Sequence, residues 1–366
     1  MKAAILLLIS VMSAAAAQTS TQSFEELSKS AQQAYNAQHD DDAVRLFTEA
    51  VNIKPDYTQG WWAIGMIDYQ HDRYPECRDA LTRMVALDAT AAPGFALLGL
   101  CEFRTKQYDL AFQHLKQAHM LVPVREGGGP LLDMANFHLV MLLTRQGAFE
   151  LAQDVAVQVA LKDRDNPDMM FATGLACLRM PILPEEVPQN QRQVVAMAGK
   201  AYWDLITQPP EQTETDFKAL VAAYPNFPNV HFFYATYLAA HHPEESVPEF
   251  LAELKVQPDS VPARVSLALR YITDGKTAEA LKYARDAVAL SPDSVGCQLA
   301  LGEALKAGGN DKDALVAYQA AEKLDPESAK VRLYLVNAYR AVGRVEDMRR
   351  EREEYERIKK SEQNWP

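Results

Sequence analysis

Proline returns at a fixed interval in this chain. Pro258, Pro292 and Pro326 are each 34 residues apart, and Pro55 and Pro123 lie two such intervals apart. Proline cannot continue a helix and commonly follows a helix end. The interval therefore marks the ends of repeated helical units. One small unit cannot bury its own apolar face, so such units must stack and cover one another.

Small residues recur at fixed places inside these units. They lie 12 and 5 residues before the period positions: Ala43 and Ala50, Ala111 and Ala118, Ala280 and Ala287, Ala314 and Ala321. Large apolar residues, Phe47, Leu115 and Tyr318, stand between them. A small residue at a constant place predicts that two helices approach closely there. Each unit is therefore predicted to be a pair of packed helices.

The first helix of each pair has a pattern of its own. Trp61-x-x-Ile64-Gly65 and Phe95-x-x-Leu98-Gly99 place an aromatic, an aliphatic and a glycine at the same spacing. The turns between paired helices carry Gly275, Gly309 and Gly343, where a helix end favours glycine in the left-handed conformation.

Together these features resemble the tetratricopeptide repeat family, a 34-residue helix–turn–helix repeat. The resemblance is specific over 24–123 and 227–343 and weak between them. It implies an all-α fold, in which the repeats stack as a right-handed superhelical α-solenoid interrupted in the middle. In the family, the concave groove of the solenoid holds a protein or peptide partner.

The middle of the chain departs from the period. A glycine run at 127–129 and a proline-rich turn at 181–188 insert extra residues. We therefore expect five segments: a signal peptide at 1–17, an N-terminal repeat block at 18–123, irregular repeats at 124–226, a C-terminal repeat block with a charged capping helix at 227–360, and a tail at 361–366.

The resemblance also implies which residues face a partner. In the family, the groove is lined by the second, fifth, ninth and twelfth positions of the first helices. Here the corresponding candidates for partner binding are mostly aromatic or large apolar residues: Trp62, Met66, Tyr69, Leu100, Phe103, Phe137, Met141, Phe171 and Leu175. Exposed apolar patches usually mark contact sites, and aromatics and methionine are enriched in them. The alternative is that these side chains are core, or that the insertions at 124–132 and 181–190 fill the groove.

Charge and the N-terminus limit the partners and the location. The formal net charge is −12, which argues against a nucleic-acid partner because phosphate contacts need clustered Lys and Arg. Lys2, an apolar stretch over 3–11 and a small-residue run ending at Ala17 have the order of a secretory signal peptide. We expect an exported, periplasmic or secreted chain without a transmembrane segment after cleavage.

The four cysteines, Cys77, Cys101, Cys177 and Cys297, form no CxxC pair, so a zinc site is not expected. They are interpreted as buried apolar residues on helices. Cys77 and Cys101 fall on helices of adjacent repeats and are the one pair that merits a test for a disulfide.

Catalytic motifs are missing. The sequence contains no GxSxG, HExxH or GxxxxGK pattern. His241-His242, the only adjacent histidine pair, is interpreted as a solvated turn before Pro243. We therefore predict no catalytic residues, no metal site, no cofactor and no enzyme activity. The leading hypothesis is an interaction scaffold outside the cytoplasm that holds an apolar or amphipathic peptide or helix. The alternative is a structural spacer or self-assembling envelope component with no groove ligand.

Overall fold

The computed structural model describes residues 23–122 and 128–362. The predicted signal peptide lies outside these residues, as do Gly127 and the end of the predicted tail. Within the described ranges every regular element is a helix. This confirms the predicted all-α class. No helix among the described residues is long and apolar enough to cross a membrane.

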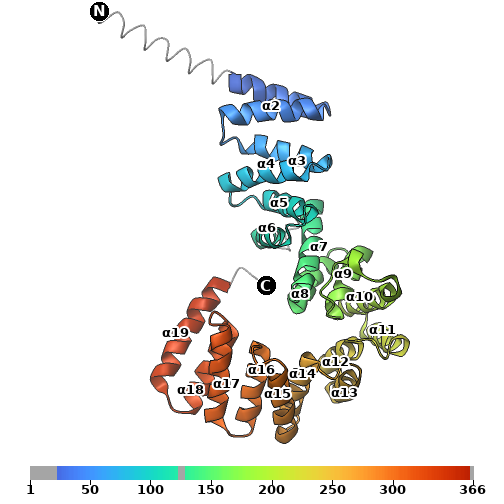
Figure 1. The fold of residues 1–366 in the computed structure, drawn as a ribbon, viewed down its shortest axis with the longest axis vertical. Helices are drawn as coiled ribbons and strands as arrows, with labels where there is room; N and C mark the ends of the chain where they lie inside the picture. Colours follow the sequence, from blue (N-terminus) through green and yellow to red (C-terminus); the bar gives the residue numbers. More distant parts are fainter. Residues whose placement is uncertain (1–22, 123–127, 363–366) are drawn as a thin grey trace, which may run out of the picture. The chain divides into compact units, whose positions relative to one another are not determined.

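The chain divides into two compact units, Met1–Gln146 and Gly147–Pro366. Unit 1 begins with a helix over 23–36. It continues with α2 (Asp40–Ile53), α3 (Thr58–Gln70), α4 (Tyr74–Leu87), α5 (Ala92–Arg104), α6 (Tyr108–Leu121) and α7 (Gly129–Arg145). Figure 1 shows these helices in the blue to blue-green part of the chain.

Unit 2 contains the remaining helices. Its first part holds α8 (Phe149–Ala160), α9 (Pro167–Cys177), the short 3-10 turns η2 (Pro184–Glu186) and η3 (Gln189–Gln191), α10 (Arg192–Thr207) and α11 (Pro210–Ala223). Regular pairs then follow: α12 (Val230–His241) and, after η4 (Pro243–Glu245), α13 (Ser246–Val256); α14 (Val261–Thr273) and α15 (Thr277–Leu290); α16 (Val295–Ala307) and α17 (Asp311–Leu324); α18 (Ala329–Ala341) and α19 (Val345–Glu362).

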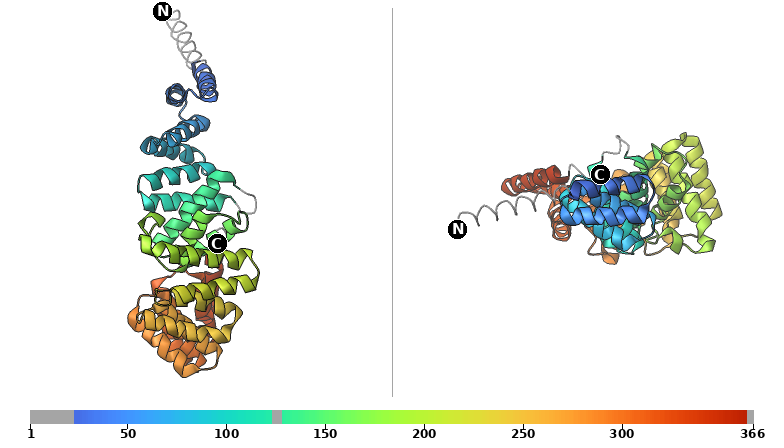
Figure 2. Two further views of the ribbon diagram at one scale, coloured as in Figure 1. Left: turned by 90° about the vertical axis from the view of Figure 1, so that its right-hand side faces the viewer. Right: turned by 90° about the horizontal axis from the view of Figure 1, so that it is seen from above.

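Consecutive helices pair as the small-residue pattern predicts. α3 packs on α4, α5 on α6, and α16 on α17, and the views in Figures 1 and 2 show these pairs side by side. All eight alanines that lie 12 and 5 residues before the period positions are buried. A Cβ added to Gly99 would lie 2.6 Å from Cγ of Leu115 on the paired helix, so only glycine permits that approach. The predicted helix–turn–helix repeat is therefore confirmed in both units.

The turn inside most of these pairs uses one left-handed residue. Gly275, Gly309 and Gly343 have φ values of 71°, 75° and 77°, which confirms their predicted place. In unit 1 the same turn is made by Gln38, Asp72 and Lys106, at φ values of 59°, 57° and 60°. A side chain is strained in this conformation. The N-terminal repeats therefore hold the same turn at a higher conformational cost.

The interrupted middle is divided between the two units. α7 begins at Gly129, directly after the glycine run, because Pro130 is accepted in the first turn of a helix. The proline-rich insertion after α9 folds back onto its own unit, where Leu183 and Val187 are buried. α11 places Phe217 in a core that also includes Phe233 of α12. The irregular segments thus contribute core residues.

A disulfide joins Cys77 of α4 to Cys101 of α5, with 6.4 Å between their Cα atoms. Both cysteines are fully buried. The bond crosses from one repeat to the next and closes a loop of 24 residues. By the chain-entropy estimate, closing such a loop stabilises the fold by about 3 kcal/mol. Cys177 and Cys297 are buried free thiols, as expected of apolar residues on helices.

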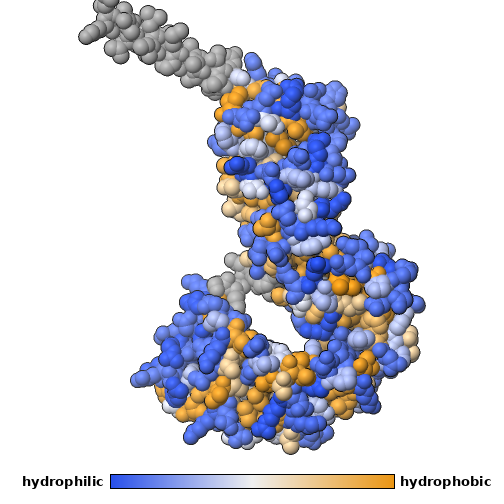
Figure 3. Space-filling view, viewed as in Figure 1, coloured by the Kyte–Doolittle hydropathy of each residue, from blue (hydrophilic) through white to orange (hydrophobic). Residues whose placement is uncertain are grey.

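α19 is the last helix of the described chain. Its surface is largely hydrophilic in Figure 3. Ile358 is buried, and the nearly buried Glu351 carboxylate accepts from Arg332 of α18 at 2.7 Å. A polar outer face over a packed inner face is the arrangement that the predicted capping helix would have.

The turn residues generate a stability prediction. Lys106→Gly removes left-handed strain from an exposed residue whose side chain makes no hydrogen bond or ion pair within the described chain. We expect the free energy of unfolding to rise by about 0.5 kcal/mol, after allowing for the greater freedom of glycine in the unfolded chain. Gly309→Ala should lower it by about 1 kcal/mol, since a Cβ there meets no atom within 4 Å and only the backbone strain changes. Urea unfolding of the two variants measures both effects, and a loss of stability in Lys106→Gly would contradict this account.

Candidate functional site

The first helices of unit 1 form one surface. α3 contacts α5, and α5 contacts α7, so the candidate residues on these helices share a face. Trp62, Met66, Tyr69, Phe103 and Phe137 are partly exposed on it. In Figure 3, hydrophobic patches interrupt the hydrophilic surface of unit 1. These five residues remain candidates for partner contact.

Three of the predicted residues are core. Leu100, Met141 and Leu175 are 1%, 5% and 1% exposed. Their assignment to a groove surface is therefore corrected. Leu100 lies on α5, which is flanked by α3 and α7, and Leu175 belongs to the core around α10 and α12. Apolar residues at helical spacing occur both in the core and on the groove surface. The stacking of neighbouring helices determines which of these residues are buried.

The last two residues of the predicted series, Phe171 and Leu175, lie on α9 and belong to unit 2. Phe171 is partly exposed, but the Arg192 guanidinium of α10 lies 4.5 Å from its ring centroid. That ring already has a cationic partner from its own unit. The candidate surface is therefore confined to unit 1.

At one end of this surface, α7 covers the aromatic rings. The Tyr69 hydroxyl lies 3.9 Å from the Met134 sulfur, which joins α3 to α7. The Phe103 ring meets the His138 ring edge-on at 4.6 Å. Phe137 lies 5.4 Å from the same imidazole. The chain therefore fills this end of the groove with its own side chains.

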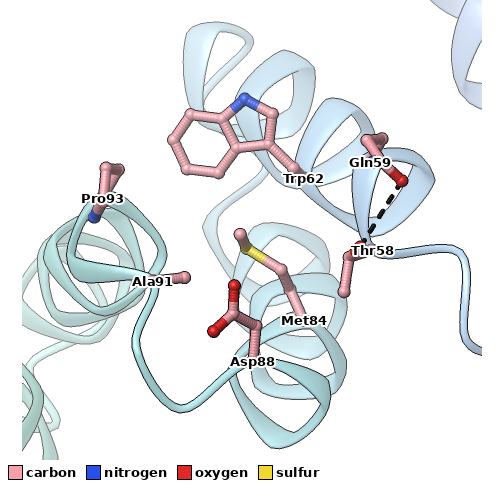
Figure 4. Close-up of a pocket in the computed structure, with 7 residues that line it drawn as sticks. All are labelled: Thr58, Gln59, Trp62, Met84, Asp88, Ala91 and Pro93. Atoms are coloured by element: carbon pink, nitrogen blue, oxygen red, sulfur yellow. Dashed lines mark hydrogen bonds between the residues drawn. The ribbon is translucent and has the colours of Figure 1, made fainter.

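The other end is open. Between α3, α4 and the start of α5 the surface forms a pocket of about 340 Å³. We call it the Trp62 pocket; it is lined by Thr58, Gln59, Trp62, Met84, Asp88, Ala91 and Pro93. Figure 4 shows the Trp62 indole above, the Met84 thioether in the middle and the Asp88 carboxylate below it, with Pro93 on the opposite wall. Most of the lining is apolar, and its one formal charge is negative.

Asp88 is held as a carboxylate. Its Oδ1 accepts from the Thr90 backbone N–H at 2.9 Å and from the Thr90 hydroxyl at 2.7 Å. The hydrogen bond from the Thr90 hydroxyl has the larger effect and the one from its backbone N–H the smaller. Together they hold the pKa of Asp88 below its usual range. Asp88 also caps the C-terminus of α4, where the last turn carries no basic residue. The pocket therefore keeps its negative charge at neutral pH.

Sequence reasoning identified Trp62 and missed the residues opposite it. Met84 and Asp88 stand at the end of a second helix, and the family pattern places groove residues on first helices only. A signal was present in the repeat itself. The position of Asp88 is occupied by Lys54 one period earlier, so the charge at this place reverses from one repeat to the next.

Two other clusters in the described chain are weaker candidates for a binding site. A hollow in unit 2 is lined by residues of α12, α13 and α14, including Leu269 and Arg270, but Arg270 is paired with Asp274. Potential ligand atoms of His242, Glu244 and Glu245 lie within 4.8 Å of one another. The two acids are exposed at a helix start, where acids are common. We assign no metal to them.

The contact between α6 and α7 sets the position of α7 beside the candidate surface. His119 of α6 is buried, and its Nδ1 lies 2.9 Å from the Asn136 amide oxygen of α7. Burial lowers the pKa of His119, and the hydrogen bond to Asn136 opposes this in part. The neutral imidazole is therefore the form that the fold favours.

The described helices define the class of protein: an α-helical repeat scaffold built of stacked two-helix units. Residues 236–295 match the family model of the tetratricopeptide repeat. The period, the buried alanines and the turn residues seen in both units resemble the same repeat.

Solved structures of repeat proteins are similar to this chain at low identity. Two structures of MamA, a double mutant and the form from residue 41 to the end from Desulfovibrio magneticus RS-1, are 19% and 20% identical, with TM-scores of 0.42 and 0.39. Each match covers 47% of this chain and 97% of MamA. The tetratricopeptide domain of P58(IPK) is 14% identical over 88% of this chain and 99% of that one, with a TM-score of 0.31. No curated protein sequence matches the chain significantly.

Lowering the pH should weaken the packing of α7. Between about pH 7.5 and 5.5 the unfolded chain takes up a proton at position 119 more readily than the fold does, because the folded pKa is the lower of the two. Stability contributed by neutral His119 is therefore present above the unfolded pKa and lost as the pH falls below it. His119→Gln removes this group, so its melting temperature should fall less between the two pH values than that of the wild type. Equal decreases in thermal melts followed by circular dichroism would rule the explanation out.

Proposed function

We propose that this protein is an exported, non-enzymatic scaffold that holds an apolar or amphipathic segment of a partner protein on the first-helix surface of unit 1. The observation that carries the proposal is the partial exposure of Trp62, Met66, Tyr69, Phe103 and Phe137 on helices that pack side by side. Members of the tetratricopeptide repeat family generally serve as interaction scaffolds, which agrees with it.

The open end of this surface is the place of first contact. At the closed end, Tyr69 and Phe103 already contact Met134 and His138 of α7. At the open end, Trp62 and Met66 have neither an aromatic nor a cationic partner among the described residues. Tryptophan is enriched among the residues that dominate binding energies, and methionine adapts to varied apolar shapes.

Export is supported by two independent features. The signal-like N-terminus is one, and it would be removed on cleavage after Ala17. The Cys77–Cys101 disulfide is the other, because structural disulfides persist mainly outside the reducing cytoplasm. The second feature depends on tertiary contact and not on the N-terminus.

The alternative, a spacer or self-assembling component, has support of its own. The second helices of unit 1 carry the exposed side chains of Leu87 and Leu110, which are 46% and 48% exposed. Association through these helices would leave the first-helix surface without a role.

Removing the aromatic surface should remove the partner. In an affinity purification from the native envelope fraction, the triple variant Trp62→Ala, Phe103→Ala, Phe137→Ala should lose proteins that the wild type retains. If each aromatic contributes about 1 kcal/mol at the interface, the three truncations together weaken binding by about 3 kcal/mol, or roughly a hundredfold.

The matched control is the double variant Leu87→Ala, Leu110→Ala, which removes exposed apolar surface from the opposite helices. It should retain the partners. If the control loses them and the triple variant keeps them, and light scattering shows concentration-dependent association of the wild type, the self-assembling alternative replaces the groove.

Export predicts the oxidation state of Cys77 and Cys101. In the full chain both thiols should resist alkylation under native and denaturing conditions until a reductant is added, whereas deletion of residues 2–17 should yield a reduced, cell-retained protein. Cys77→Ala with Cys101→Ala should lower the free energy of unfolding by about 3 kcal/mol. Reduced thiols in exported protein, or cell retention of the full chain, would contradict the proposal.

A further inference from the structure

We propose that the Trp62 pocket binds one basic side chain, Arg or Lys, of the partner segment. This proposal rests on the groove function and specifies the partner's chemistry: an amphipathic segment that presents a cation to unit 1. It is carried by the shape of the pocket, by an unmatched negative charge and by a contrast between successive repeats.

The shape suits a long side chain with an apolar stem. Trp62, Met84 and Pro93 provide apolar walls, and the Asp88 carboxylate lies beyond the Met84 thioether (Figure 4). Arg and Lys bury their methylene stems along apolar surface while the charged head reaches a polar group. An indole face is the most favourable aromatic surface for a cation. An uncharged apolar side chain would fill the walls but leave the carboxylate desolvated without a partner.

The negative charge of Asp88 in the Trp62 pocket is not neutralised by another described residue of the chain. Oδ1 of Asp88 is taken up by Thr90, but Oδ2 has no hydrogen-bond or ion-pair partner among the described residues. No Lys or Arg lines the pocket. The C-terminus of α4 adds the partial negative charge of its free carbonyls. An incoming cation therefore meets two negative contributions and no competing positive one.

The preceding repeat shows the complementary arrangement. Lys54 occupies the position one period before Asp88, and its ammonium lies 5.2 Å from the centroid of the Phe24 ring. There the chain supplies both the cation and the aromatic. At Asp88 it supplies an aromatic, Trp62, and an anion, but none of its described cations lies over the indole. The component that the chain does not supply at the Asp88 site is therefore a cation.

The test uses the full chain with its disulfide intact and two probes. One is an acetylated, amidated amphipathic peptide of leucine, alanine and arginine. The other replaces every arginine with citrulline, which keeps the shape but removes the charge. Isothermal titration at physiological salt should show that the arginine peptide binds the wild type about tenfold more tightly, the ratio that corresponds to 1.4 kcal/mol.

Asp88→Asn keeps the acceptor for Thr90 and removes the charge, so it should abolish most of that tenfold preference. The matched control is Asp109→Asn, which removes an exposed carboxylate that makes no side-chain hydrogen bond or ion pair in the described part of unit 1. It should keep the preference. Equal preference in wild type and Asp88→Asn would overturn the proposal, because the selectivity would then come from the net charge of the protein alone.

The two proposals fail in different ways. If both peptides bind the wild type equally and Trp62→Ala weakens both, the groove function stands and the basic-anchor proposal is wrong. If neither peptide binds, or if Trp62→Ala changes nothing, both are wrong. Thermal melts of each variant confirm that the fold is retained, since none of the three substitutions alters a fully buried residue.

Discussion

The close approach of paired helices is the constraint on which the rest of the structure depends. At Gly99 there is no room for even one additional carbon against Leu115, and the alanines at the period positions are wholly enclosed. A pair packed so closely has one face still uncovered, so the next repeat must cover it. The stacking and the placement of first helices side by side both follow from that requirement.

The same stacking determines which apolar residues remain for a partner. α5 lies between two other first helices, so its Leu100 is buried, whereas Trp62 and Met66 of α3 remain partly exposed. Toward α7, Met134 and His138 reach Tyr69 and Phe103 and occupy the surface from within. The packing of the first helices thus closes the surface at the α7 end and leaves a pocket at the α3 end, where Asp88 is the only charged lining residue.

The negative charge of this pocket comes from a carboxylate at the end of α4. Asp88 keeps its charge because Thr90 donates two hydrogen bonds to one of its oxygens, which leaves the other oxygen directed to the surface. The disulfide, about three helical turns before Asp88 on α4, joins this helix to α5, so the two helices that wall the pocket are covalently linked. A preorganised site of this kind loses less entropy on binding.

The sequence by itself determined the class of fold, the repeat length, the buried alanines and the turn glycines, since these follow from local spacing and from the conformational limits of single residues. It also singled out Trp62 and the cysteine pair of adjacent repeats. It did not distinguish Leu100, Met141 and Leu175 from Trp62 and Phe103, because core and groove residues share the same helical spacing and the same apolar chemistry. Only the tertiary structure decided that distinction, and only it brought Met84 and Asp88 beneath Trp62, because exposure depends on how neighbouring repeats pack and not on the periodicity within one of them.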